Sequence, residues 1–244
     1  MKKLLVDVVT VVDPDSPISE QYRTIRTNIE HKKNEENIQT IFLTSANSGE
    51  GKTTTIINLG VVFAKAGQKV LIVDCDIRKR SLSQMLGLSK ADGIVSLLNS
   101  EKKLEDTIYQ TNVANLALLP SGRTVKNPAE LLLTHKLVTL VEELKERYDL
   151  ILFDTPPILE VADAQILSTK LDRCVLVVRE NYSSKSSIKK AKETLDNMGC
   201  HYLGIVHNYS NVNMSNYGYR GLNGKYGYGD IKSRKKKSIF NFWK

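Results

Sequence analysis

Cysteine, histidine and long apolar runs are scarce in this sequence. Cys75, Cys174 and Cys200 lie far apart and form no C-x-x-C pair, and the four histidines lack metal-ligand spacing. We therefore expect reduced, packed thiols, with neither a cysteine nucleophile nor a metal–cysteine site. No apolar run approaches the ~18–20 residues of a transmembrane helix. Asp7 interrupts the short apolar start and no cleavage pattern follows, so we expect a cytoplasmic protein.

Charge is ordinary in amount but uneven in position. Charged residues make up 25% of the chain and hydrophobic residues 41%, which suits one layered α/β fold. Much of the net charge of +8 comes from a basic run at 232–237, followed by an aromatic segment at 239–244. Such a run is either a solvated tail or a contact for an anionic surface. The aromatic residues favour a membrane surface, and we expect no nucleic-acid partner because the rest of the chain shows no ordered basic face.

Apolar runs and helical segments alternate from residue 40 onwards. Short continuous apolar runs, typical of strands buried on both faces, occur at 41–43, 69–73, 116–119, 150–153, 175–178 and 203–206. The longer helices are predicted at about 52–66, 128–147 and 186–198. This alternation predicts an α/β fold with a mostly parallel central sheet and helices on both faces.

The first segment is predicted to be an extension of this fold. Residues 1–39 contain turn residues and then a helix that Ser19 can cap. Glu20, Arg23 and Arg26 recur at steps of three, so they share one polar face of that helix. This face is either a contact between subunits or a solvated surface with local ion pairs.

A change of composition marks the end of the predicted α/β domain, which spans residues 40–208. Residues 209–244 combine glycine and asparagine at a density that opposes both helix and sheet, and this predicts a flexible tail. The tail is also rich in tyrosine, and its candidate modification sites are Tyr217, Tyr219, Tyr226 and Tyr228.

The loop after the first apolar run carries the strongest motif. Residues 46–53 read Ala-Asn-Ser-Gly-Glu-Gly-Lys-Thr and fit the phosphate-binding pattern G-x-x-x-x-G-K-[ST] except at the first position. Backbone N–H groups in such a loop, together with the dipole of the following helix, hold phosphate. Lys52, at a junction we expect to be solvated, would reach the β- and γ-phosphates, and the Thr53 hydroxyl would bind Mg²⁺. The candidate nucleotide contacts in this segment are Ser48, Gly49, Glu50, Gly51, Lys52, Thr53 and Thr54.

Three aspartates at the ends of predicted strands complete a P-loop NTPase site for ATP and Mg²⁺. Asp74 and Asp76 are two residues apart and can project from the same face of their strand. Asp154 ends a later strand in the form that positions Mg²⁺, directly or through water. Carboxylates this close repel one another unless a cation lies near them. The expected metal ligands are therefore Thr53, Asp76 and Asp154.

Two further residues are candidate nucleotide contacts, and for each a purely structural role stays open. Arg78 follows the second strand and either contacts phosphate or pairs with a carboxylate. Asn208 follows the last strand and either reads the adenine edge or forms a turn.

Together these motifs resemble the bacterial tyrosine kinases, the cytoplasmic kinase subunits of capsule and exopolysaccharide systems. The resemblance covers residues 18–208 and the type of tail. The segment 19–29 is similar to the family's E-x-x-R-x-x-R helix, and 46–53 to its Walker A motif. The segments 71–78 and 151–157 are similar to its additional acidic strand and its Walker B motif.

The resemblance implies a protein-tyrosine autokinase that phosphorylates its tail, with Lys52, Asp74, Asp76 and Asp154 as catalytic residues. It implies that Asp74 accepts the proton of the tyrosine hydroxyl and that the helix face joins subunits into a ring. It also implies a transmembrane activator (a polysaccharide co-polymerase), a cognate phosphotyrosine phosphatase, and recruitment to the inner face of the cell membrane. Because the tail is tethered, we expect phosphorylation in trans, between subunits.

A membrane-positioned P-loop ATPase that works as a conformational switch stays open as the alternative. Its site would be nearly identical. The tyrosine-rich tail favours the kinase, and so does the loop, which lacks the extra lysine of the related partition and division-site ATPases. Cys75 departs from the alanine or glycine usual in the kinase family, and we expect it to pack in the core.

Overall fold

The computed structural model describes residues 4–209. The four candidate tail tyrosines and the basic run at 232–237 lie outside the described residues. The division of the chain at residues 39 and 208 stays a prediction. Within residues 4–209, no helix combines the length and the apolar character needed to cross a bilayer.

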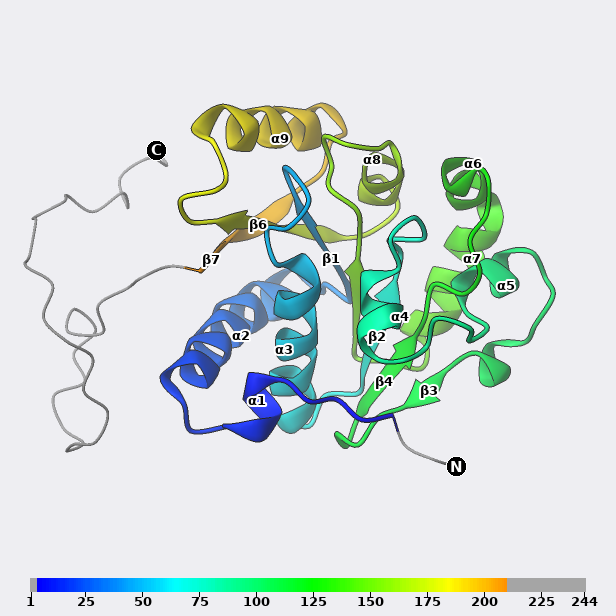
Figure 1. The fold of residues 1–244 in the computed structure, drawn as a ribbon, viewed down its shortest axis with the longest axis horizontal. Coiled ribbons are helices and arrows are strands. Elements are labelled where there is room, and N and C mark those ends of the chain that lie inside the picture. The colour runs from blue at the N-terminus through cyan, green and yellow to red at the C-terminus, as the bar shows by residue number, and fades with distance from the viewer. Residues whose placement is uncertain (1–3, 210–244) are drawn as a thin grey trace, which may run out of the picture. The chain divides into compact units, whose positions relative to one another are not determined.

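A seven-stranded sheet forms the centre of the described part (Figure 1). Its strands lie in the order β3-β4-β2-β5-β1-β6-β7. All neighbours run parallel except β3, which is antiparallel to β4. The strands are β1 (Thr40–Ser45), β2 (Val70–Asp74), β3 (Tyr109–Gln110), β4 (Leu116–Leu119), β5 (Leu150–Asp154), β6 (Arg173–Arg179) and β7 (Tyr202–Asn208).

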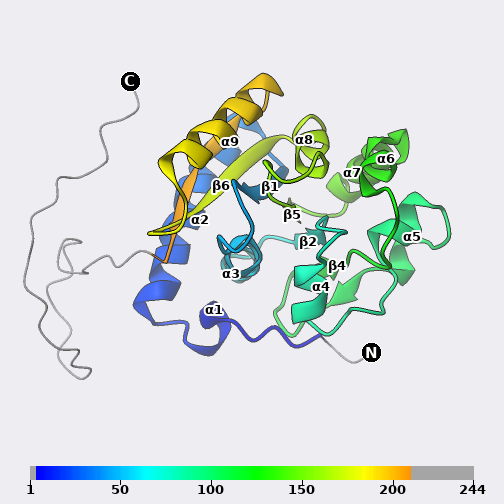
Figure 2. The same ribbon diagram turned by 45° about the horizontal axis from the view of Figure 1, so that its top comes forward.

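Helices cover both faces of the sheet, as Figures 1 and 2 show. The helices are α1 (Val9–Val12), α2 (Pro17–Glu36), α3 (Lys52–Lys65), α4 (Ser81–Met85), α5 (Ile94–Leu98), η1 (Leu104–Asp106, a 3-10 turn), α6 (Pro128–Leu133), α7 (His135–Lys145), α8 (Asp163–Ser168) and α9 (Lys185–Asn197). One apolar cluster lies between the sheet and α2 and α3, and a second between the sheet and α6 to α9. Strands β1, β2, β4 and β5 are buried along their whole length, which explains their uninterrupted apolar sequences. The predicted mostly parallel α/β fold is confirmed.

Two local predictions are wrong. Ser16, and not Ser19, caps α2: the Ser16 side chain accepts the Ser19 N–H, and Pro17 occupies the first turn. The helix predicted at 128–147 is two helices, because Thr134 has extended backbone angles (φ −60°, ψ 151°). Its hydroxyl donates to the Leu131 carbonyl at 2.8 Å, a local bond that competes with the helix.

The strand register brings the acidic strand ends together. Strands β2 and β5 are neighbours, and Asp74 lies directly opposite Asp154. On the other side of β5, Leu43 of β1 lies opposite Asp154, so the loop that follows β1 starts beside these carboxylates. Open α/β sheets bind their ligands at this edge, outside the carboxyl ends of the strands.

Candidate active site

The loop between β1 and α3 has the backbone of an anion-binding loop. Gly49 and Gly51 have positive φ angles of 77° and 93°, a conformation that side chains with a Cβ rarely adopt. Gly51 caps α3, and no side chain caps the N–H groups of its first turn. These donors therefore point into the loop without a side-chain partner, as phosphate binding requires.

Asn208 closes the loop from the far edge of the sheet. Its Nδ2 donates to the Glu50 carbonyl at 3.3 Å. A Cβ added to Gly51 would lie 1.9 Å from that same nitrogen, so a larger residue on this positive-φ backbone would displace the Asn208 side chain. The structure thus brings Asn208 to the loop, as an adenine-reading role needs, and its contact with the base stays a prediction.

Lys52 is buried, contrary to the expectation of a solvated junction. Only 7% of the residue is exposed, and its Nζ donates to Ser45 Oγ at 3.0 Å. Burial lowers the pKa of Lys52, while the charges of Asp154 and Asp76 oppose that shift. The ammonium group therefore faces two carboxylates across the site.

Asp154 has one carboxylate oxygen with a partner and one without. Thr53 Oγ1 donates to its Oδ2 at 2.7 Å, whereas its Oδ1 is buried and has no hydrogen-bond partner among residues 4–209. Burial, reinforced by the charge of Asp74, raises the pKa of Asp154 to about 8. A buried polar atom without a partner is costly, so this oxygen suits the binding of a cation.

The site can hold Mg²⁺ with few protein ligands, as nucleotide-dependent enzymes commonly do. Residues 4–209 contain no cluster of three or more His, Cys, Asp or Glu side chains that could hold a metal by itself. Mg²⁺ commonly takes one or two protein ligands and completes its shell with substrate phosphates and water. The side chains that would hold it are those of Thr53, Asp76 and Asp154.

Asp74 and Asp76 have different surroundings. Asp74 is fully buried, and its Oδ2 accepts hydrogen bonds from Ser83 N at 2.9 Å and Ser83 Oγ at 2.6 Å. Burial raises the pKa of Asp74 to about 6, against the lowering effect of the Ser83 bonds. Asp76 lines the loop cavity, and burial raises its pKa as well. Cys75, between them, is fully buried, so the prediction that it packs is confirmed.

A cavity of about 210 Å³ lies over the loop and unites most of the predicted contacts. Seven of its lining residues were expected from the sequence: Ser48, Gly49, Gly51, Lys52, Thr53, Thr54 and Asp76. Four were not: Lys79, Ser81, Pro157 and Tyr209. The Glu50 side chain is buried and accepts a hydrogen bond from Ser183 Oγ at 2.6 Å, so it faces away from the cavity. Glu50 can contact a nucleotide only through its backbone.

Sequence reasoning also missed an arginine that stacks between two aromatic rings beside the loop. The Arg179 guanidinium lies 5.0 Å from the Tyr182 ring centre and 4.4 Å from that of Tyr209. Its Nη1 donates to the Gly49 carbonyl at 3.1 Å, and the Tyr182 hydroxyl donates to the Ser48 carbonyl at 3.2 Å. Arg179 ends β6, Tyr182 lies in the turn after it, and Tyr209 directly follows β7, and no sequence motif marks them.

Arg78 and the three polar residues predicted on α2 have partners within the chain. Arg78 forms a two-pronged ion pair with the buried Asp163, at 2.9 and 3.0 Å, which is the alternative left open by the sequence. On α2, Glu20 pairs with Arg23 at 2.7 Å, and Arg26 donates to the Val62 carbonyl of α3 at 3.1 Å. A phosphate contact for Arg78 and a subunit contact for α2 stay predictions.

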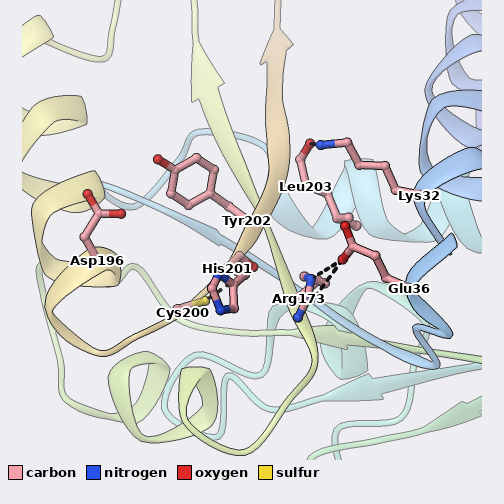
Figure 3. Close-up of a pocket in the computed structure, with 8 residues that line it drawn as sticks. All are labelled: Lys32, Glu36, Arg173, Asp196, Cys200, His201, Tyr202 and Leu203. Atoms are coloured by element: carbon pink, nitrogen blue, oxygen red, sulfur yellow. Dashed lines mark hydrogen bonds and ion pairs between the residues drawn. The ribbon is translucent and has the colours of Figure 1, made fainter. Parts of the chain in front are cut away.

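A second cavity, of about 310 Å³, lies at the opposite ends of β6 and β7 from the loop (Figure 3). It is lined by residues from the end of α2, the end of α9 and the starts of both strands. Arg173 pairs with Glu36 across it at 2.7 Å, and Lys32 Nζ donates to the Leu203 carbonyl at 3.3 Å. Because these charged groups already bond within the chain, the loop cavity is the stronger active-site candidate.

Comparison with known proteins agrees with the geometry. A family model described as an AAA domain matches residues 19–202. The structure of the septum site-determining protein MinD from Pyrococcus horikoshii, complexed with Mg-ADP, has 31% sequence identity and a TM-score of 0.58. That match covers 68% of this chain and 68% of the MinD chain.

Tyrosine kinases match over more of the chain. Tyrosine-protein kinase YwqD of Bacillus subtilis (strain 168) is 42% identical over 216 residues, which are 88% of this chain and 91% of YwqD. The crystal structure of the chimerical protein CapA2B2 has 35% sequence identity and a TM-score of 0.79, and it covers 85% of this chain and 93% of its own. The recognition made from the sequence is thereby confirmed: this chain belongs to the bacterial tyrosine-protein kinase family.

Proposed function

We propose that this protein transfers the γ-phosphoryl group of ATP to tyrosines of its own tail, in trans between subunits. The observation that carries the proposal is the cavity in which Lys52, Thr53 and Asp76 meet at the carboxyl ends of the strands. Asp154 lies beside it with an unpartnered buried oxygen. The acceptors are Tyr217, Tyr219, Tyr226 and Tyr228.

The chain's own residues supply positioning and charge. The backbone N–H groups of residues 48–53 bind the phosphates, and the Lys52 ammonium neutralises the β- and γ-phosphate oxygens. Bound Mg²⁺ supplies further charge neutralisation of the phosphates. The tyrosine oxygen forms a bond to the γ-phosphorus as the bond to the β–γ bridging oxygen breaks, so ADP leaves. An aspartate accepts the hydroxyl proton, and the resemblance assigns that step to Asp74.

The remaining parts of the proposal concern assembly and pathway. Glu20, Arg23 and Arg26 join subunits into a ring, and Asn208 reads the adenine edge. A transmembrane activator stimulates the kinase at the inner face of the cell membrane, where the basic run at 232–237 meets anionic lipid. A phosphotyrosine phosphatase removes the phosphates from the tail. This cycle of phosphorylation and dephosphorylation regulates capsular or exopolysaccharide synthesis and export. The kinase relatives favour this function over the ATPase switch.

Mass spectrometry of the purified protein tests the central claim. After incubation with ATP and Mg²⁺, with and without the activator segment, we expect phosphate on the tail tyrosines. The Lys52→Met variant is the matched control, because methionine is unbranched, keeps most of the length of the buried side chain and removes its charge; it should show no phosphate. ATP hydrolysis by the wild type without any tyrosine phosphorylation, activator included, would favour the ATPase switch instead.

A further inference from the structure

A glutamate that the catalytic scheme does not use is bonded to the phosphate loop. Glu160 lies beyond the end of β5, 112 residues from Ser48 in the sequence. Its Oε1 accepts the Ser48 N–H at 2.6 Å, and its Oε2 accepts the Ser48 hydroxyl at 2.8 Å. Both oxygens of one carboxylate thus contact one loop residue.

The charges around this contact favour an ionised carboxylate. Lys79, which lines the loop cavity, lies 3.8 Å from Glu160 Oε2 and also donates to Ser48 Oγ. Burial raises the pKa of Glu160, but the Ser48 hydrogen bonds and the charges of Lys79 and Lys52 outweigh it and leave the pKa below its ordinary value. Glu160 is therefore negatively charged at neutral pH, at the mouth of a loop that attracts anions.

A carboxylate in this position resembles a phosphate oxygen bound by the same kind of donor. Charge-assisted hydrogen bonds from backbone N–H groups are the means by which such loops hold phosphate. An arriving nucleotide carries several negative charges, and like charges at short range repel. The side chain of Glu160 is 38% exposed, so water can solvate the carboxylate once it leaves Ser48.

We propose that Glu160 competes with the nucleotide phosphates for the phosphate loop and so sets the affinity of this kinase for ATP. This inference rests on the proposed binding of ATP at the loop. In the nucleotide-free protein, Glu160 and Lys79 hold Ser48 in place. Binding of the nucleotide requires that Glu160 release Ser48, and the loss of this bond weakens the observed affinity.

The test is a comparison of nucleotide affinity between the wild type and Glu160→Gln. Glutamine keeps the size and one acceptor oxygen of the side chain and removes its charge. We expect Glu160→Gln to bind ATP and inorganic pyrophosphate about threefold to tenfold more tightly, by titration calorimetry. The difference should shrink at high salt, which screens partly exposed charges. Glu142→Gln, which removes an exposed glutamate from α7, is the matched control and should bind like the wild type.

The outcomes separate this inference from the function on which it rests. Tighter binding by Glu160→Gln, with wild-type binding by Glu142→Gln, supports competition. Equal or weaker binding by that variant, while the wild type binds ATP, would overturn the inference and leave the proposed kinase intact. Absence of any ATP binding by the wild type would overturn the proposed function, and the competition with it.

Discussion

Thr53 Oγ1 donates a 2.7 Å hydrogen bond to Asp154 Oδ2, which ties the first turn of α3 to the end of β5. The bond holds one carboxylate oxygen and leaves the other, Oδ1, buried without a partner. A group in this state is stable only if it binds a proton or a cation. Two of the three residues that we expect to hold Mg²⁺ thus already contact each other, beside a carboxylate oxygen that a cation can satisfy.

The first prediction follows from the raised pKa of Asp154, which is about 8 in the folded protein. An unfolded aspartate titrates near pH ~4, so below that value both states are protonated and the full stability is present. As the pH rises towards 8, only the folded state retains the proton, and the nucleotide-free protein loses stability.

Asp154→Asn should remove most of this pH dependence, because the amide does not titrate. We expect its melting temperature without Mg²⁺ to exceed that of the wild type by about 2–6 °C near pH 8 and by less near pH 5. Differential scanning fluorimetry across the pH range measures the effect. Asp15→Asn, at an exposed aspartate, is the control. Parallel pH profiles for wild type and Asp154→Asn would contradict the prediction.

The second prediction separates the roles of Asp74 and Asp76. Asp76 lines the cavity, so Asp76→Asn should lower the rate of phosphoryl transfer about 100-fold or more and leave the melting temperature nearly unchanged. Asp74 accepts bonds from Ser83 and from the Asp76 N–H. An asparagine NH₂ group cannot accept a hydrogen bond, so Asp74→Asn should cost about 1–3 kcal/mol of stability.

Initial rates and denaturant unfolding of both variants provide the comparison. If Asp74→Asn keeps wild-type stability and loses activity, then the resemblance is right that Asp74 accepts the tyrosine proton. If it loses stability and keeps activity in the fraction that remains folded, then Asp74 supports the site without touching the substrate.

The third prediction concerns the close approach of Gly51 to Asn208. Gly51→Ala places a Cβ 1.9 Å from Asn208 Nδ2 on a backbone with φ of 93°. We expect at least about tenfold weaker ATP binding and a loss of about 1–3 kcal/mol of stability, because the strained loop must move. Gly204→Ala in β7, where an added Cβ meets nothing within 4 Å, is the control. Wild-type ATP affinity in Gly51→Ala would show that the loop adapts.

The sequence predicts those parts of the fold and of the site that local patterns encode. Continuous apolar runs mark β1, β2 and β5 because these strands are buried on both faces. The two-residue β3 and the five-residue α4 have no such pattern, since a period cannot be read from so few residues. The glycines of the phosphate loop are visible because only glycine accepts that backbone.

Local sequence patterns do not predict contacts between segments that are far apart in the sequence. The Glu160–Ser48 contact depends on how the turn after β5 packs against the loop after β1. The stacking of Arg179 on Tyr209 depends on β7 lying at the edge of the sheet beside β6. The wrong expectation for Lys52 has the same origin, since Lys52 is buried where its Nζ bonds to Ser45 of β1 near the charge of Asp154 of β5.

The fourth prediction tests whether α2 joins subunits. Replacing Glu20, Arg23 and Arg26 together by alanine should reduce the assembled mass in light scattering, with the activator segment present. The local Glu20–Arg23 pair contributes only about 0.2–0.5 kcal/mol, so its loss alone leaves the fold intact.

The control for this variant removes another exposed pair from the same helix, His31 and Glu35, which lie 3.5 Å apart. That double-alanine variant should assemble like the wild type. Unfolding curves for both variants check that loss of the Arg26 bond to Val62 has not loosened α2 from α3. Monomeric wild type and variant alike would mean that the α2 face is a solvated surface.

The last prediction is that phosphorylation runs between subunits. The acceptor tyrosines follow β7 on a glycine-rich segment, and a tether raises the effective concentration of a neighbour's tail once subunits assemble. Each phosphate adds about −1.5 to −2 charges, so modified tails repel and favour dispersal of the assembly.

The test mixes a Lys52→Met chain that has an intact tail with an active chain truncated after Tyr209. Truncation there keeps Tyr209, which lines the cavity and stacks on Arg179. Radiolabelled phosphate on the inactive chain is the expected result, whereas an unlabelled inactive chain within proven mixed assemblies would mean that each subunit phosphorylates its own tail.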